Sequence, residues 1–160
     1  MLDPRSKALA SCVDAAIAAG RIDLGLRAYE RQTAISARML AHHFGGNAGI
    51  KIAVLEEIEA RLRSEVAEAL AESGMAPIDV ARTFAAPERR ELRRLLQIIL
   101  HGALGEDAAA VEVLADERQR WRDMLGSLIP EEDVEQALFI LVGGAVDAML
   151  GDAEGSIGPA

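Results

Sequence analysis

Apolar residues recur every three or four positions along most of this chain, and that spacing predicts amphipathic α-helices. No stretch alternates between apolar and polar residues over the length of a strand, and β-branched residues do not gather between turn signals. Prolines, glycines and short polar residues mark where the helices start and stop. The sequence therefore predicts an all-α fold.

The first 46 residues are expected to form a head of three short helices. Asp3 and the proline after it begin a helix whose apolar residues keep helical spacing until Gly20. Asp23 is expected to cap a second, shorter helix. Ser36 is expected to cap a third helix, which runs to His43 before two glycines break it.

A helical body is predicted after the head, and it begins with a long helix that Asn47 caps and that ends near Ser73. The apolar stripe of this helix consists of Leu55, Ile58, Leu62, Val66, Ala69 and Leu70. Further helices are expected over residues 77–84, from residue 87, over residues 106–125 and from residue 130 to residue 151. The predicted organisation is a head of residues 1–46, a body of residues 47–151 and a disordered tail of residues 152–160.

Charge is distributed unevenly between the predicted head and the rest of the chain. The net charge of the whole chain is -9, which by itself argues against binding to nucleic acid. Residues 1–46, however, contain six basic and four acidic residues, a net charge of +2, whereas the remainder contains 11 basic and 22 acidic residues. This asymmetry suits a small basic head on an acidic body, although +2 is a weak charge for a DNA-binding surface.

Several classes of protein are not expected from this sequence. The single cysteine excludes an intrachain disulfide, and the N-terminus does not resemble a signal peptide, so we expect a cytoplasmic protein. The longest apolar run, Ala137 to Val146, is shorter than the roughly 20 residues that a membrane-spanning helix needs.

Catalytic and metal chemistry have little support in these residues. His42 and His43 would point about 100° apart on a helix, and no further ligand occurs at matching spacing. The glycine-rich stretch of residues 45–49 lacks the lysine and the hydroxyl of a P-loop. No Gly-x-Ser-x-Gly elbow is present. We therefore expect no enzyme activity, no cofactor and no metal.

The head has the pattern of a helix-turn-helix. Its second and third helices are expected to lie only three or four residues apart, and a long helix follows them. In such an arrangement the third helix enters the major groove of DNA while the second helix braces it. By periodicity alone this pattern is modest evidence, because many helical bundles contain two short helices joined by a tight turn.

The residues of the head resemble those of the tetracycline-repressor (TetR) family. Gly20 is followed at the family's spacing by Leu26, then by Thr33-Ala34-Ile35-Ser36, then by Leu40-Ala41-His42-His43-Phe44, without a gap. The resemblance covers roughly residues 6–70 in motif and the rest of the chain in architecture only. It implies a TetR-like fold and a dimeric transcriptional regulator that binds double-stranded DNA, in most cases a repressor that responds to a ligand.

The resemblance and the helical phase together indicate which residues would face DNA. These residues are Ser36, Ala37, Arg38 and His42 on the recognition helix, with Arg27 and Arg31 on the helix before it. Arg38 is the strongest candidate for a base contact, because an arginine can bind O6 and N7 of guanine together. Arg38 could also be a solvated surface residue, and Arg27 and Arg31 could either meet phosphates or simply face solvent.

The head also departs from the family at positions that matter for DNA. Ala41 stands where the family has a tyrosine, and Asn47 stands where it has a lysine; both family residues commonly touch phosphates. Tyr29 and Glu30 replace an isoleucine and an alanine on the second helix. Fewer phosphate contacts predict weaker binding with a shallower salt dependence. The alternative function is a TetR-like interaction or ligand-binding module that has lost DNA binding.

For the body, the resemblance implies a ligand pocket and a dimer interface. Candidates to line a pocket for a small apolar effector are Phe84, Gln97, His101, Trp121 and Met124. His101 and Trp121 could equally be core residues with hydrogen-bonded side chains. The run from Ala137 to Val146 lacks a polar side and so needs cover on more than one face, from a second subunit or from the core of a monomer. The residues expected at the homodimer interface are Leu138, Leu141, Gly144, Ala145 and Ala148.

Overall fold

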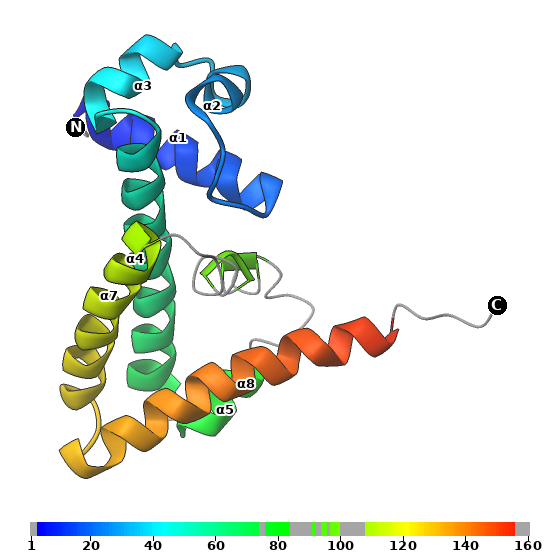
Figure 1. Ribbon diagram of the computed structural model, residues 1–160. Coiled ribbons are helices and arrows are strands. Elements are labelled where there is room, and N and C mark those ends of the chain that lie inside the picture. Colours follow the sequence, from blue (N-terminus) through cyan, green and yellow to red (C-terminus); the bar gives the residue numbers. More distant parts are fainter. Residues whose placement is uncertain are drawn as a thin grey trace. The chain divides into compact units, whose positions relative to one another are not determined.

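The computed structural model describes residues 3–73, 76–83, 91, 94–95, 97–99 and 108–155 (Figure 1). Regular structure in these ranges is helical and no strand occurs among them, so the predicted all-α fold is confirmed. The helices are α1 (Pro4–Ala19), α2 (Leu26–Thr33), α3 (Ala37–Phe44), α4 (Asn47–Ser73), α5 (Pro77–Thr83), α7 (Ala108–Gly126), the short 3-10 helix η2 (Glu131–Asp133) and α8 (Val134–Gly155). None of the described helices is both long and apolar enough to span a membrane.

The chain divides into two compact units. The first unit contains Met1–Ala60 and Ile98–Ala115, and the second contains Arg61–Gln97 and Asp116–Ala160. Both α4 and α7 therefore contribute one part to each unit. The first unit holds the three helices of the predicted head together with about the first half of α4, so it extends beyond the expected range of residues 1–46.

The first unit is built around α1, which packs against α2, while α2 packs against α3 (Figure 1). Asp3 caps α1 as predicted, because its side chain accepts hydrogen bonds from the backbone N–H groups of Arg5 and Ser6 at 2.8 and 3.1 Å. Gly20 ends this helix with a φ of 69°, a left-handed conformation that glycine adopts without strain. The largest fully buried side chains of this unit are Val13, Tyr29, Leu40, Ile50, Val54, Leu55, Ile58 and Ile98.

The second unit contains the later part of α4, with α5, most of α7 and α8. The α4 stripe was predicted correctly, since Leu62, Val66 and Leu70 are buried here and Leu55 and Ile58 are buried in the first unit. Ala69 is half-buried. Helices α5 and α8 pack closely against each other (Figure 1). A Cβ atom built on Gly144 would lie only 2.4 Å from the Cβ of Ala81, so α8 approaches α5 at a point where no side chain fits.

Two of the predicted helix caps are wrong. Asp23 does not cap α2; its carboxylate pairs with Arg21 at 2.6 and 3.0 Å, and Gly25 is the N-cap residue. Asn47 is the first residue of α4 and not its N-cap. Its side-chain oxygen accepts the N–H of Leu26 at 2.9 Å, so it caps α2 from a distant part of the sequence. A local reading of the sequence cannot predict a cap that comes from 21 residues away.

The end of α8 also differs from the prediction. The helix continues to Gly155, so residues 152–155 belong to α8 and not to a disordered tail, and residues 156–160 lie outside the described residues. Extending an existing helix adds one hydrogen bond for each residue fixed, which favours continuation through Asp152, Ala153 and Glu154.

Candidate nucleic-acid interface

A tight turn joins α2 to α3 and sets the direction of the recognition helix. Ala34 ends α2 in the left-handed conformation, with a φ of 57°, and its N–H donates to the carbonyl of Glu30 at 3.1 Å. The hydroxyl of Thr33 donates to the carbonyl of Tyr29 at 2.8 Å and accepts the N–H of Ile35 at 3.3 Å. These bonds satisfy backbone groups in the turn, so the chain leaves α2 in a defined direction.

Two side chains cap the N-terminus of α3. Ser36 accepts the N–H of Met39 at 3.2 Å, as a Ser N-cap is expected to do. Glu30, on α2, accepts the N–H of Ala37 at 3.1 Å. A carboxylate at this position also faces the positive end of the helix dipole. The charge of Glu30, which the sequence analysis treated as a departure from the family pattern, therefore ties α2 to the start of α3.

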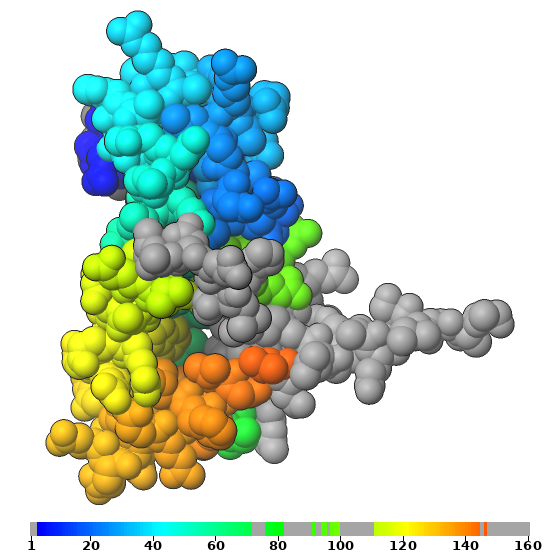
Figure 2. Space-filling model, viewed as in Figure 1, coloured from blue at the N-terminus to red at the C-terminus, as the bar shows by residue number. Residues whose placement is uncertain are grey.

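The outer side of α3 is exposed, and its inner side forms part of the core. Leu40 and Phe44 are buried, whereas Ala37, Ala41 and His43 are half-buried. Figure 2 shows the atoms of α3, in cyan, and those of α2, in blue, next to each other on the surface of the molecule. The exposed side chains of the helix and its cap are Ser36, Arg38, Met39 and His42.

Three arginines on α2 and α3 are exposed and unpaired. Arg27, Arg31 and Arg38 form no ion pair with any part of the chain that the structure describes. Arg21 differs from them, because its guanidinium is already paired with Asp23. Unpaired guanidinium groups on two helices that pack together can bind phosphate oxygens or guanine without first breaking an internal ion pair.

Arg5 contacts the C-terminal end of α3, a role that the sequence analysis did not predict. Its Nε donates to the carbonyl of His43 at 3.3 Å, and its guanidinium carbon lies 5.5 Å from the centre of the Phe44 ring. A cation at the C-terminus of a helix interacts favourably with the helix dipole. The pairing joins residues 38 positions apart, so no local pattern in the sequence could have indicated it.

The start of α4 is fixed against α2 and α3. Besides the cap that Asn47 provides for α2, Gly49 lies so close to α3 that an added Cβ would be 1.7 Å from the carbonyl oxygen of Phe44. Only glycine fits at that position. Asn47 therefore has a structural role in this chain, because its side chain joins the start of α4 to the start of α2.

Tyr29 and Cys12 lie in the core behind this surface. Both side chains are fully buried, and the Tyr29 hydroxyl has no hydrogen-bond partner among the residues that the structure describes. Burial raises the pKa of the Cys12 thiol to about 11. Burial also raises the pKa of the Tyr29 phenol above its ordinary value, with smaller contributions to that shift from Cys12 and Asp23. The thiol is therefore neutral near pH 7 and lacks the thiolate character that a reactive cysteine needs.

The predicted pocket residues are not brought together by anything that the structure describes. Gln97 is exposed, Trp121 and Met124 are half-buried, and Phe84 and His101 lie outside the described residues. A ligand pocket lined by these residues remains a prediction.

Some of the α8 residues that were predicted to form a dimer interface pack within the chain instead. Leu141 is buried, Leu138 is half-buried and Gly144 packs against Ala81, whereas the side chains of Ala145 and Ala148 lie outside the described residues. A different side of α8 is exposed: Phe139 is 79% exposed, Val142 is 52% exposed and Val146 is 37% exposed. When a helix has apolar residues on every side, its sequence does not indicate which side faces the core of the chain. Two of the residues predicted for the dimer interface, Leu141 and Gly144, lie on the side of α8 that faces the core.

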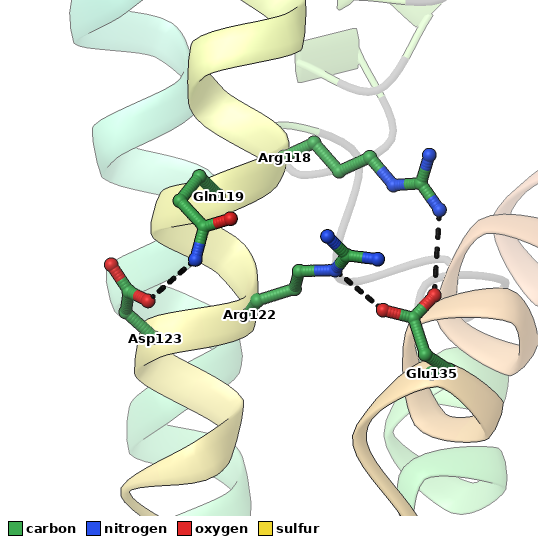
Figure 3. Close-up of polar contacts among 5 residues, drawn as sticks. All are labelled: Arg118, Gln119, Arg122, Asp123 and Glu135. Atoms are coloured by element: carbon green, nitrogen blue, oxygen red, sulfur yellow. Dashed lines mark hydrogen bonds and ion pairs between the residues drawn. The ribbon is translucent and has the colours of Figure 1, made fainter.

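Ion pairs that the sequence analysis did not predict connect the helices of the second unit. The buried carboxylate of Glu117 on α7 accepts hydrogen bonds from Arg63 on α4 and from Arg120. Arg118 and Arg122, also on α7, both reach Glu135 at the start of α8, as Figure 3 shows; the Arg118 nitrogen lies 3.4 Å from the Glu135 oxygen. The hydrogen bond from Arg122 lowers the pKa of the exposed Glu135 carboxyl.

The arrangement of the head, a helix pair joined by a short turn with an exposed second helix, is shared by many helical proteins. A fold alone does not define a function, so the function has to be inferred from the side chains that this arrangement presents. Comparisons of the chain with models of protein families, with curated proteins and with solved structures find no match.

Proposed function

We propose that this chain is a TetR-like transcriptional regulator that binds double-stranded DNA through α3. The observation that carries this proposal is the exposed outer side of α3, together with Arg27 and Arg31 on α2 and Arg38 on α3, which are exposed and form no ion pair within the described residues. A helix-turn-helix needs a second helix whose outer side is free to enter the major groove and whose inner side is anchored in the protein. The buried Leu40 and Phe44 anchor the inner side of α3, and Arg38 and His42 are exposed on its outer side.

The side chains around α3 have separate roles in this proposal. Arg38 lies in the first turn of α3, where recognition helices contact base edges, and it reads guanine. Arg27 and Arg31 lie on α2, which crosses the backbone in this geometry, and they bind phosphates. Ser36, Ala37 and His42 complete the surface that faces DNA.

The exposed apolar side of α8 supports the part of the proposal that the protein binds DNA as a homodimer. Phe139, Val142 and Val146 recur at intervals of three and four residues, so they form one stripe on the helix, and the exposed Gly143 lies within it. Covering such a stripe with that of a second copy removes apolar surface from water and gives an interface with two-fold symmetry. A dimer would place two α3 helices on two half-sites of a palindromic operator. In this proposal an effector that binds the body shifts the population of DNA-competent dimers, which makes the protein a ligand-responsive repressor.

A gel-shift series with the chain's own upstream region, at about 50 to 200 mM salt, tests the proposal. We expect a competable complex that weakens steeply as salt rises. Arg38→Ala should relax sequence preference, with a loss of about 1 to 3 kcal/mol on the preferred duplex, whereas Arg27→Ala should weaken all duplexes alike and lower the salt slope by about one unit. Arg118→Ala is the matched control, because it removes an exposed arginine from the body.

One observation favours a second candidate, a helical interaction module that does not bind DNA. Asn47 is engaged with the N–H of Leu26, and the half-buried Ala41 offers no phosphate contact, so two of the family's usual contacts are missing. If no competable complex forms at about 50 mM salt, the DNA-binding proposal is wrong and this second candidate stands.

A further inference from the structure

Met39 is an exposed apolar side chain on α3, next in sequence to the exposed Arg38. Its side chain is 48% exposed, and among residues 3–60, all of which the structure describes, it is the one large hydrophobic residue that is exposed. Its backbone N–H donates to Ser36, which fixes Met39 in the first turn of α3. The same turn carries Arg38, and His42 follows three positions later on the same side.

We propose that Met39 determines sequence specificity by contacting the 5-methyl group of thymine in the major groove. The proposal rests on the proposed function, because it requires α3 to lie in that groove. A methionine side chain donates no hydrogen bond and is only a weak acceptor, so it cannot distinguish bases by their donors and acceptors. The apolar feature of the major-groove edge of unmodified DNA is the thymine methyl group, and apolar side chains recognise it by direct contact.

The position and chemistry of Met39 suit this contact. The thioether chain is long, unbranched and adaptable, so it can follow a base edge without a fixed rotamer. The neighbouring Arg38 is unpaired within the described residues and supplies the charge that draws the helix to DNA. Arg38 on guanine and Met39 on an adjacent thymine would together read two base pairs from one turn of helix.

The test begins by selecting duplexes from a random pool with the full-length chain and measuring affinity by gel shift. Each thymine of the selected duplex is then replaced by deoxyuridine, which removes the methyl group and leaves every hydrogen-bonding atom in place. We expect one or two positions at which this replacement weakens binding by about three- to fivefold, the effect of losing one buried methyl group. In Met39→Ala the same replacement should have no effect.

Two control variants separate this contact from general damage. Arg38→Ala should lose preference for guanine and keep the deoxyuridine effect, whereas Met39→Leu, which keeps an apolar side chain, should retain part of it. Alanine is a strong helix former, and an exposed methionine contributes little to packing, so Met39→Ala should melt at the temperature of the parent in circular dichroism.

The possible results distinguish this inference from the function on which it rests. If a duplex is selected but no deoxyuridine position matters, or if Met39→Ala keeps the deoxyuridine effect, the role of Met39 is refuted and DNA binding stands. If no duplex is enriched at all, DNA binding itself is refuted, and the role of Met39 with it.

Discussion

Ala34 has a conformation that most residues other than glycine avoid. With a φ of 57° it is the one residue other than glycine with a positive φ among those that the structure describes. The left-handed conformation costs an L-residue about 1 to 2 kcal/mol, yet the turn between α2 and α3 requires it.

Replacing Ala34 with glycine should therefore stabilise the protein. Relief of the strain outweighs the additional chain entropy of glycine, so we expect Ala34→Gly to raise the free energy of unfolding by about 0.5 to 1 kcal/mol. Urea denaturation followed by circular dichroism measures the difference. Ala28→Gly is the matched control; it places glycine within α2, where it should lower the free energy of unfolding by about 1 kcal/mol. Equal losses in the two variants would contradict our account of the turn.

The buried Cys12 and Tyr29 make the free energy of unfolding depend on pH in the alkaline range. The folded-state pKa of Cys12 is raised from 9.0 to about 11, and that of Tyr29 is raised above its ordinary 10.0, so the folded state keeps these protons where the unfolded state releases them. Their contribution to the free energy of unfolding is fully present below pH 9.0. The contribution of Cys12 is lost as pH rises from 9.0 to its folded-state pKa, and that of Tyr29 is lost as pH rises from 10.0 to its folded-state pKa.

We therefore expect the free energy of unfolding to fall between about pH 9 and 11, with a slope that approaches about 1.4 kcal/mol per pH unit for each proton released. Urea denaturation at a series of pH values checks this. Cys12→Ala should flatten the part of the slope that begins at pH 9.0. If the slope in Cys12→Ala matches that of the parent, the thiol titrates alike in the folded and unfolded states and the argument fails.

At the scale of elements, the head is held together by caps that pass between helices. Glu30 on α2 caps α3, Asn47 on α4 caps α2, and Arg5 on α1 binds the C-terminal end of α3. Each bond satisfies a backbone group that a short helix leaves without an internal partner. Helices as short as α2 and α3 are marginal alone, so these contacts together with the buried Tyr29, Leu40 and Phe44 keep α3 in position.

The cap that Asn47 provides can be tested with two substitutions. Asn47→Ala removes the oxygen that accepts the N–H of Leu26 and should lower the free energy of unfolding by about 1 kcal/mol. Asn47→Asp keeps an acceptor oxygen at that position and should lie close to the parent. Thermal unfolding followed by circular dichroism compares the three proteins. An Asn47→Asp loss as large as that of Asn47→Ala would show that the hydrogen bond is not what Asn47 contributes.

At the scale of the whole molecule, the surface proposed for dimerisation lies on α8. The stripe of Phe139, Val142 and Val146 is exposed along a helix whose other side, including Leu141, is buried within the chain. We expect Phe139→Asp to halve the mass measured by sedimentation equilibrium at micromolar protein, because the variant would bury a charge in an apolar interface.

The control for this experiment is Val111→Asp, which alters an exposed apolar residue on α7 and should leave the mass unchanged. If the parent chain sediments as a monomer, the proposed dimer is wrong. Gel shifts with Phe139→Asp then show whether DNA binding needs the dimer, since one α3 helix reaches only one half-site.

The sequence by itself determined the order of the described helices and most of their ends. Capping residues such as Asp3 and Ser36, glycines such as Gly20 and Gly45, and the apolar stripe of α4 all act within a few residues of one another, so local patterns predicted them. The exposure of Ser36, Arg38 and His42 was also predicted from the helical phase, whereas Ala37 is half-buried and the exposed Met39 was not in the predicted set.

Only the tertiary structure decided which side of α8 faces outward, which residue caps α2, and which charges are neutralised. Glu117 is buried because Arg63 comes from another helix to pair with it, and Asn47 serves α2 because the fold brings their ends together. These contacts join residues that are far apart along the chain. Their energies depend on distances that folding creates, and no periodicity or local motif records those distances.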